Sequence, residues 1–272
     1  MRDTPTIATS TAPHAHIRHH VLVLSGKGGV GKSTVAVNLA IALQMAGQRV
    51  GLLDVDIHGP SIPTMLGLEG TRLRGTEELL QPVEHDGLRV MSLGFMLTDQ
   101  DDAVIWRGPL KMKLIRQFLE QVAWGDLDVL VIDAPPGTGD EPLSVCQVLG
   151  AVSGAVIVTT PQKVAAVDVR KAITFCRTLQ VPVLGVVENM SGFVCPTCGT
   201  RTAIFPAGSA ARMAREMHVP FLGAIPIDPR IAAAGDEGRA FVRQPGAGPA
   251  ADIMRSIMQP VLALDTPDAV SH

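Results

Sequence analysis

The sequence lacks the features that direct a chain to a membrane, to secretion or to nucleic acid. No segment approaches the roughly 18 consecutive apolar residues of a membrane span, and residues 3–16 lack the charged-then-apolar order of a signal peptide. The net charge is only −3, so no basic field favours nucleic acid or an anionic membrane. Only four cysteines occur in 272 residues, too few for a disulfide framework. We therefore expect a cytoplasmic protein with neither a nucleic-acid nor a membrane partner.

What the chain does have is a regular alternation of apolar, strand-like runs with helix-like segments. The runs are nearly continuous in Val, Ile and Leu, as in strands that are buried on both faces. The pattern predicts an α/β fold, a doubly wound and mainly parallel sheet with helices on both faces, as in a P-loop NTPase. The expected strands are Val21–Leu24, Val50–Leu53, Leu88–Ser92, Val129–Ile132, Ala155–Thr159, Val183–Val187 and Phe221–Ile225.

Helix-like segments of about 10 to 15 residues separate these strands. We expect a disordered tail over residues 1–17, a single domain over residues 18–265 and a C-terminal tail over residues 266–272. A Pro/Gly-rich break at residues 245–249 comes before the last expected helix. The expected helices are Ser33–Met45, Pro109–Val122, Glu141–Leu149, Val164–Leu179, Ser209–Met217 and Ala250–Leu264.

A glycine-rich phosphate loop follows the first expected strand. Residues 26–33 read Gly-Lys-Gly-Gly-Val-Gly-Lys-Ser and match the pattern G-x-x-x-x-G-K-S/T between a strand and a helix. Its glycines let backbone N–H groups turn towards a polyphosphate, and the helix N-terminus adds partial positive charge. We expect Lys32 on the β- and γ-phosphates and Ser33 on Mg²⁺. The predicted nucleotide-binding residues here are Gly26, Lys27, Gly28, Gly29, Val30, Gly31, Lys32, Ser33 and Thr34.

Carboxylates follow the second and fourth expected strands. Asp54 and Asp56 lie where parallel strands open onto the ligand-binding crevice of such sheets. Asp133 ends an apolar strand, which is typical of the Walker B carboxylate that holds Mg²⁺ through a water. The Pro-Pro-Gly-Thr-Gly segment that follows, centred on Gly137, is expected to sense the γ-phosphate. Such catalysis rests on positioning and charge neutralisation, so slow turnover coupled to a change of shape is expected.

Cys195 and Cys198 form a C-x-x-C pair after the sixth expected strand. Two thiolates at this spacing can converge on one metal or cluster, but the pair supplies only half of a four-ligand site. Cys146 and Cys176 lie in expected helices and are predicted to be buried and inert. A twofold dimer would complete a Cys₄ site from two identical pairs. The spacing alone does not choose between zinc and an iron–sulfur cluster.

In this order, the motifs resemble the Mrp/ApbC (Nbp35-like) subfamily of P-loop ATPases, the iron–sulfur cluster carriers. The likeness covers residues 18–245, and the two-lysine loop is the deviant Walker A form that is shared with MinD and ParA. The resemblance implies a homodimer that holds a 4Fe–4S cluster between two C-x-x-C pairs. It also implies that the cluster passes to apo iron–sulfur proteins, with ATP binding or hydrolysis tuning its assembly or release, and that cluster scaffold proteins are further partners. The matching segments are Gly26–Ser33, Asp56–Ser61, Asp133–Asp140, Glu188–Ser191 and Cys195–Gly199.

The same resemblance implies roles for single residues. Lys27 would reach across the dimer to the partner's nucleotide, and Asp56 would polarise the attacking water. Asp54 would help to hold the magnesium shell. Asn189 would contact the adenine, and the segment Pro226–Pro229, which begins with Pro226, would border the base. The residues that it assigns to catalysis are Lys27, Lys32 and Asp56.

Three alternatives compete with this interpretation. A MinD-like membrane-cycling ATPase needs a basic amphipathic C-terminal helix, whereas the last expected helix has Arg255 as its only cation. A ParA-like segregation ATPase needs clustered surface cations for DNA phosphates, and Lys111, Lys113 and Arg116 are too few. An ATPase dimer with an intersubunit structural zinc is the serious alternative, because it uses the same two cysteines.

Overall fold

The structure is a computed structural model of the whole chain. Both expected tails lie outside the residues that it describes, except that Ile17 opens the first strand. Ile57 and His58, between the aspartates and the next helix, also lie outside them. The described residues are 17–56, 59–76, 79–96, 108–195, 197–205, 208–246 and 248–265, with residues 108–112 and 163–164 described by their backbone only.

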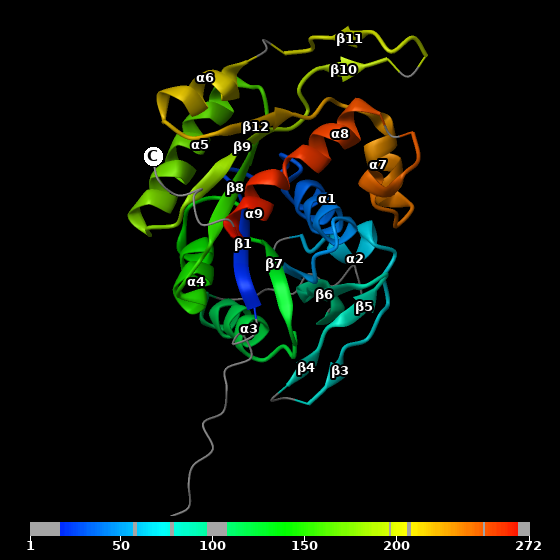
Figure 1. Cartoon of the computed structure of the whole chain (residues 1–272). Coiled ribbons are helices and arrows are strands. Elements are labelled where there is room, and N and C mark those ends of the chain that lie inside the picture. The colour runs from blue at the N-terminus through cyan, green and yellow to red at the C-terminus, as the bar shows by residue number, and fades with distance from the viewer. Residues whose placement is uncertain are drawn as a thin grey trace, which may run out of the picture.

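An eight-stranded sheet forms the centre of the molecule (Figure 1). Its strand order is β12-β9-β8-β1-β7-β2-β6-β5, and all neighbours are parallel except β5 and β6. All seven expected strands are present, and the predicted α/β fold is confirmed. The strands of this sheet are β1 (Ile17–Ser25), β2 (Val50–Asp54), β5 (Val83–His85), β6 (Leu88–Ser92), β7 (Leu127–Asp133), β8 (Gly154–Thr159), β9 (Val183–Glu188) and β12 (Phe221–Ala224).

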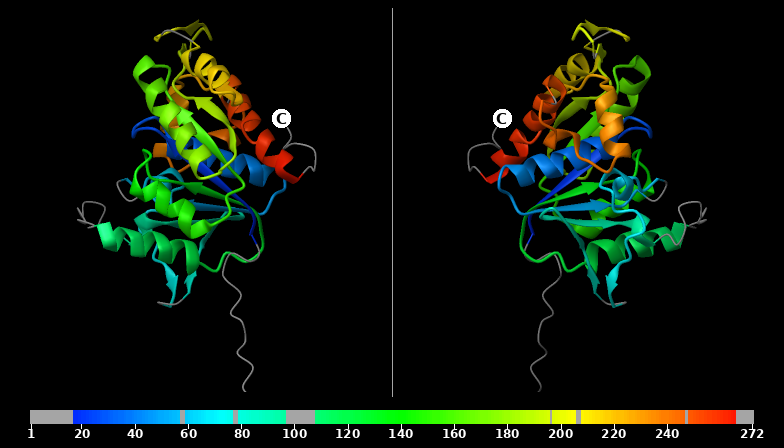
Figure 2. Two further views of the ribbon diagram at one scale, coloured as in Figure 1. Left: turned by 90° about the vertical axis from the view of Figure 1, so that its left-hand side faces the viewer. Right: turned by 90° about the vertical axis from the view of Figure 1, so that its right-hand side faces the viewer.

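Helices cover both faces of the sheet (Figure 2). Helices α1 and α8 lie on one face, and α3, α4 and α5 lie on the other. No helix among the described residues is both long and apolar enough to cross a membrane. The helices are α1 (Lys32–Met45), α2 (Ile62–Met65), α3 (Gly108–Glu120), α4 (Asp140–Leu149), α5 (Lys163–Thr178), α6 (Ser209–Glu216), α7 (Pro229–Asp236), α8 (Pro249–Ser256) and α9 (Gln259–Leu262).

Short elements complete the fold, and the sequence pattern did not predict them. Two antiparallel hairpins stand outside the main sheet, one made of β3 and β4 and the other of β10 and β11. Strands of two residues are too short to show an alternation of apolar and polar side chains. These elements are β3 (Arg74–Gly75), β4 (Leu80–Gln81), β10 (Phe193–Val194), β11 (Arg201–Thr202) and the 3₁₀ helices η1 (Leu93–Met96), η2 (Phe241–Arg243) and η3 (Ala263–Asp265).

The helix expected over Ala250–Leu264 is the one prediction of secondary structure that was wrong. The chain forms α8, which ends at Ser256, and then the short α9 from Gln259. Pro260 lies in the first turn of α9, where its missing N–H costs nothing. In one continuous helix the same residue would leave the Ser256 carbonyl without its donor, so the helix breaks before it.

Helix α1 is buried all round because it lies between the sheet and the C-terminal elements. It contacts β1, β2 and β7 on one side and α8 and η2 on the other. Residues 35–43 are all buried, including polar Asn38. Asn38 is satisfied there, since its Nδ2 donates to the Thr34 carbonyl at 2.8 Å and its Oδ1 accepts from Val242 N at 2.9 Å. This helix therefore holds the loop before it rigidly against the sheet.

The carboxyl ends of four parallel strands bring the predicted site residues to one edge. Strands β1, β2, β7 and β9 end at Ser25, Asp54, Asp133 and Glu188. Asp54 is the register partner of Asp133 in the β2–β7 pair. Parallel sheets bind ligands at this edge, where the chain turns from strand to helix.

Candidate functional site

The loop between β1 and α1 has the conformation that a phosphate loop requires. Gly31 caps α1 with φ of 80°, a left-handed conformation that favours glycine. A Cβ at this position would also collide with the side-chain nitrogen of Asn189. That nitrogen donates to the Val30 carbonyl at 2.9 Å. The loop is therefore held against Asn189, which follows β9.

A buried lysine and three carboxylates form the centre of the site. The Lys32 ammonium lies 2.6 Å from Asp133 Oδ1 and 3.2 Å from Asp56 Oδ2. Burial opposes the charge of Lys32, but Asp133 and Asp56 outweigh it and raise its pKa. The lysine is thus a cation at the start of α1, which is the charge that a polyphosphate needs.

Asp54 lies behind this lysine and is fully buried. Its Oδ2 accepts from the Ser92 hydroxyl at 2.9 Å, and its Oδ1 accepts from the Asp56 amide at 3.1 Å. Burial and then the neighbouring Asp133 raise the pKa of Asp54 to about 8. Each oxygen of Asp54 already accepts a hydrogen bond, and one of these bonds fixes the backbone of Asp56.

Asp133 has the free acceptor that a metal site would use. Its Oδ2 is buried and accepts no hydrogen bond from the described residues. Burial raises the pKa of Asp133, and Lys32 opposes this shift. A buried, orphaned carboxylate oxygen next to the hydroxyl-bearing first turn of α1 suits a hard cation such as Mg²⁺. The residues present therefore fit the expected magnesium ion, with Asp133 and Ser33 as its ligands or water-mediated contacts.

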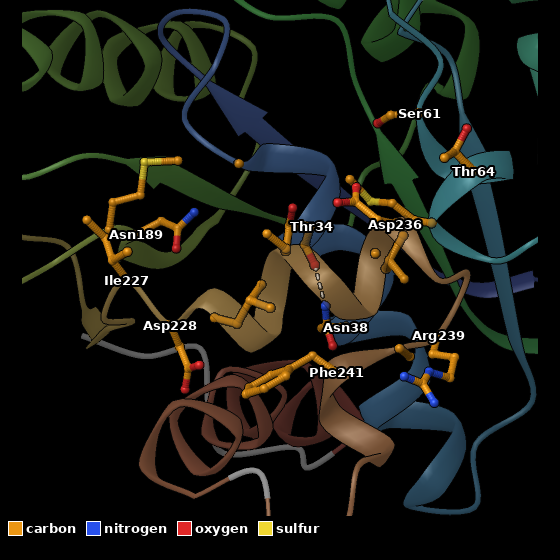
Figure 3. A pocket seen from close by; sticks show the side chains of 18 of the residues that line it. Thr34, Asn38, Ser61, Thr64, Asn189, Ile227, Asp228, Asp236, Arg239 and Phe241 are labelled. Atoms are coloured by element: carbon orange, nitrogen blue, oxygen red, sulfur yellow. Dashed lines mark hydrogen bonds between the residues drawn. The ribbon is translucent and has the colours of Figure 1, made fainter. Parts of the chain in front are cut away.

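A cavity of about 500 Å³ opens beside the phosphate loop (Figure 3). It brings Gly31 and Thr34 of the loop together with Asn189 and Pro226, the two residues expected at the base. The part of the wall formed by α2, and by α7 after its first residue, was not predicted from the sequence. Asp228 and Pro229, an N-cap and first-turn proline, are the signal that predicts the start of α7. The rest of the wall includes Asn38, Thr64, Met65, Ile231, Asp236, Arg239 and Phe241.

Two contacts join the phosphate loop and the end of β1 to neighbouring segments. The Gly137 amide donates to the Ser25 carbonyl at 2.8 Å, so the loop after β7 contacts the end of β1. The Lys27 ammonium donates to Gln162 Oε1 at 3.2 Å, at the N-cap of α5. Lys27 thus contacts α5, whereas Lys32 contacts the buried carboxylates.

Cys195 and Cys198 lie in the turn of the β10–β11 hairpin, which projects beyond β12 (Figure 1). The Cys195 amide donates to the Thr200 carbonyl at 3.0 Å, and the Gly199 amide donates to the Cys195 carbonyl at 2.9 Å. Cys198 is exposed, and its thiol lies 3.2 Å from the Thr200 hydroxyl. Hydrogen bonding to Thr200 lowers the pKa of Cys198, which favours the thiolate that binds metals.

The other two cysteines are buried, as predicted. Burial raises the pKa of Cys146 to about 11 and that of Cys176 to about 12, so both remain thiols. Within the part of the chain that the structure describes, no group of three or more His, Cys, Asp or Glu side chains could hold a metal. The pair in the hairpin thus has no third ligand among these residues.

Known proteins match this chain along most of its length. Residues 16–262 match the ParA family described as "NUBPL iron-transfer P-loop NTPase". The "Cytosolic Fe-S cluster assembly factor NUBP2 homolog" of Culex quinquefasciatus is 53% identical over 233 residues, which are 84% of this chain and 91% of that protein. The "Iron-sulfur cluster carrier protein" of Methanocaldococcus jannaschii is 51% identical over 227 residues, which are 83% of this chain and 78% of that protein.

A solved structure also resembles this chain closely. It is a nucleotide-binding protein of Archaeoglobus fulgidus in complex with ADP. The TM-score is 0.75 at 44% sequence identity, and the match covers 86% of this chain and 92% of that one. The likeness thus extends over the sheet and its flanking helices.

Proposed function

Because the chain belongs to the family of NUBPL iron-transfer P-loop NTPases, we propose that it is an ATP-dependent carrier that delivers a 4Fe–4S cluster to apo-proteins. Its relatives include a protein named as an iron–sulfur cluster carrier and one named as a cytosolic assembly factor. A cytoplasmic location, expected from the sequence, agrees with the second name. Apo iron–sulfur proteins and cluster scaffold proteins are the partners that such an activity requires.

The observation that carries the proposal is the pair of hairpin cysteines, Cys195 half-buried and Cys198 exposed, which has no third ligand among the described residues. Cys195 and Cys198 are fixed in a tight turn, and no third ligand joins them among the described residues. A second copy of the hairpin across a twofold axis supplies the missing thiolates. We therefore propose a homodimer with the cluster on its axis, and a single ATPase domain over residues 18–265 that supports the hairpin.

The nucleotide site has the groups that phosphoryl transfer needs. Backbone amides of residues 26–33 surround the phosphates, and Lys32 leaves Asp133 to contact them. The base enters the neighbouring cavity beside Asn189 and Pro226. Asn189 keeps its Nδ2 bond to the loop, so its Oδ1 faces the base as an acceptor, which suits the amino group of adenine.

Hydrolysis requires a positioned water and neutralised phosphate charge. Asp56 lies 3.2 Å from Lys32, so it faces the position of the γ-phosphate and orients the attacking water. Asp54 accepts a hydrogen bond from the Asp56 amide. Asp133 and Ser33 would hold Mg²⁺, and Asp54 would help to hold its shell. When bound, Mg²⁺ neutralises phosphate charge. Lys27 adds a second cation to the partner's nucleotide, so hydrolysis depends on the dimer.

Anaerobic reconstitution followed by iron, sulfide and zinc analysis tests the proposal. Wild-type protein is expected to bind iron and sulfide, and Cys195→Ser or Cys198→Ser to lose both while keeping the fold. Cys176→Ser is the matched control, since it removes a buried thiol of α5, outside the hairpin. Zinc in place of iron would support the structural-zinc alternative. Equal loading of all variants would refute the hairpin as the cluster site.

A further inference from the structure

Glu188 is a buried carboxylate between the nucleotide cavity and the cysteine hairpin, and neither site uses it directly. It is the last residue of β9 and is only 1% exposed. Its Oε1 accepts from the Ser191 hydroxyl at 2.6 Å, and its Oε2 accepts from the Ala210 amide at 3.1 Å, in the first turn of α6. Both of these donors are neutral. Burial of a carboxylate away from water is costly, so the two hydrogen bonds must help to offset that cost.

One side of the segment that Glu188 holds is attached to the nucleotide site. Asn189 follows directly, and its amide donates to the Thr159 carbonyl at 2.7 Å while its side chain donates to the loop at Val30. Met190 then adopts a left-handed conformation with φ of 58°. Such a conformation is strained for a side chain of this size and persists only where neighbouring bonds fix it.

The other side of the segment is attached to the hairpin. Arg201 of β11 donates to the Ser191 carbonyl at 2.9 Å. The Gly192 carbonyl accepts from Ile227 at 2.7 Å, next to Pro226 of the cavity wall. A Cβ on Gly192, which has φ of 76°, would lie 3.0 Å from the Thr202 carbonyl oxygen. Residues 189–192 therefore connect the two sites within one subunit.

We propose that Glu188 is a positioning residue that makes residues 189–192 move as one unit, so that nucleotide binding at Asn189 is transmitted to the cysteines through Ser191. The inference rests on the proposed function and adds a route inside one subunit to the expected coupling across the dimer. Among the described residues, the Ser191 hydroxyl is the one side-chain donor of residues 189–192 that bonds to the Glu188 carboxylate. Ser191 is bonded to both sides: its hydroxyl donates to Glu188, next to Asn189, and its carbonyl accepts from Arg201 of the hairpin. A change at Asn189 can therefore reach the hairpin through Ser191.

The test uses the reactivity of the two hairpin thiols in the full-length protein. The alkylation rate of Cys195 and Cys198 is measured with and without ATP and Mg²⁺, and the ratio of the two rates reports the coupling. Cys146 and Cys176 are buried and do not interfere. Ser191→Ala is expected to bring the ratio of alkylation rates at least about threefold closer to one. The variant loses the hydrogen bond to the Glu188 carboxylate that transmits the effect of the nucleotide.

Two further variants separate positioning from packing. Glu188→Gln is expected to keep the wild-type ratio, since an amide can donate to the Ser191 hydroxyl and accept from the Ala210 amide. Ser256→Ala is the matched control, because it removes a serine hydroxyl bonded at 2.7 Å to a helical carbonyl away from both sites. It is expected to leave the ratio unchanged.

ATP affinity and cluster loading are measured on the same samples. Wild-type protein that binds neither would refute the proposed function itself. Wild-type protein that binds both but shows a ratio of one, or a Ser191→Ala variant that keeps the wild-type ratio, would overturn the positioning role alone. The supporting result is a Ser191→Ala variant whose ratio of alkylation rates lies near one while its ATP affinity stays within about threefold of wild type.

Discussion

Asp54→Asn should change how the stability of the nucleotide-free protein depends on pH. The pKa of Asp54 is raised from its ordinary value of 3.8 to about 8 by burial. Between these two values the folded protein keeps the proton of Asp54, while the unfolded chain releases it. The contribution of Asp54 to the free energy of unfolding is therefore complete below about pH 4. It decreases as the pH rises towards 8, by at most about 1.4 kcal/mol per pH unit.

The asparagine variant removes this proton and keeps the local hydrogen bonds. Its carbonyl can accept from the Asp56 amide, and its amino group can donate to the Ser92 hydroxyl. Urea unfolding with a chelator at pH 5, 6, 7 and 8 gives the free energy of unfolding of both proteins. The difference, variant minus wild type, should grow by on the order of 1 kcal/mol per pH unit.

Asp128→Asn is the control of opposite sign. Hydrogen bonding to Arg49 lowers the pKa of Asp128 to about 2, so its contribution is lost only as the pH falls towards that value. Between pH 5 and 8 this variant should shift the free energy of unfolding by a constant amount. If the free energies of unfolding of wild type and Asp54→Asn change in parallel between pH 5 and 8, the raised pKa of Asp54 is refuted.

Three further predictions concern the nucleotide site. Asp56→Asn should lower kcat for ATP hydrolysis by about 10²-fold or more with ATP affinity nearly unchanged, and equal losses in kcat and affinity would contradict its role in orienting water. Lys27→Ala should keep ATP binding by calorimetry but lower hydrolysis at least about tenfold, because its charge acts on the partner's nucleotide; full activity at dimer-forming concentrations would contradict that role. Gly31→Ala should weaken ATP binding at least about tenfold, because the left-handed backbone is strained and Asn189 must move. Gly47→Ala, with φ of 89° and open space around it, should not weaken it.

The sequence predicted the sheet well because its parallel strands are buried on both faces. Strands such as β7 and β8 are nearly unbroken runs of Val, Ile, Leu and Ala, and this composition is visible without any partner. The predicted helices agree with the structure to within two residues at each end except for the last. In the last expected helix, Pro260 is a known helix breaker. Whether the chain breaks there into α8 and α9 depends on how the two parts pack on the rest of the protein.

The site could be predicted in part. The loop and the strand-end aspartates follow from spacing and from the rule that parallel strands end at one edge. The wall that α2 forms could not be predicted, because this helix has only four residues and reaches the site through tertiary packing. The start of α7 could be predicted from Asp228 and Pro229, but the position of this helix beside the cavity depends on tertiary packing. The segment Glu188–Ser191 was recognised from the sequence, but the hydrogen bonds of the Glu188 carboxylate to Ser191 and Ala210 were not, because they form only in the folded chain.

Native mass spectrometry of the anaerobically reconstituted protein tests the central claim most directly. A cluster that needs both hairpins must appear on two chains at once, because each chain offers only Cys195 and Cys198. The account predicts a two-chain species that carries one 4Fe–4S cluster and single chains that carry none. Single chains with a complete cluster, or two chains joined by one zinc ion, would contradict it.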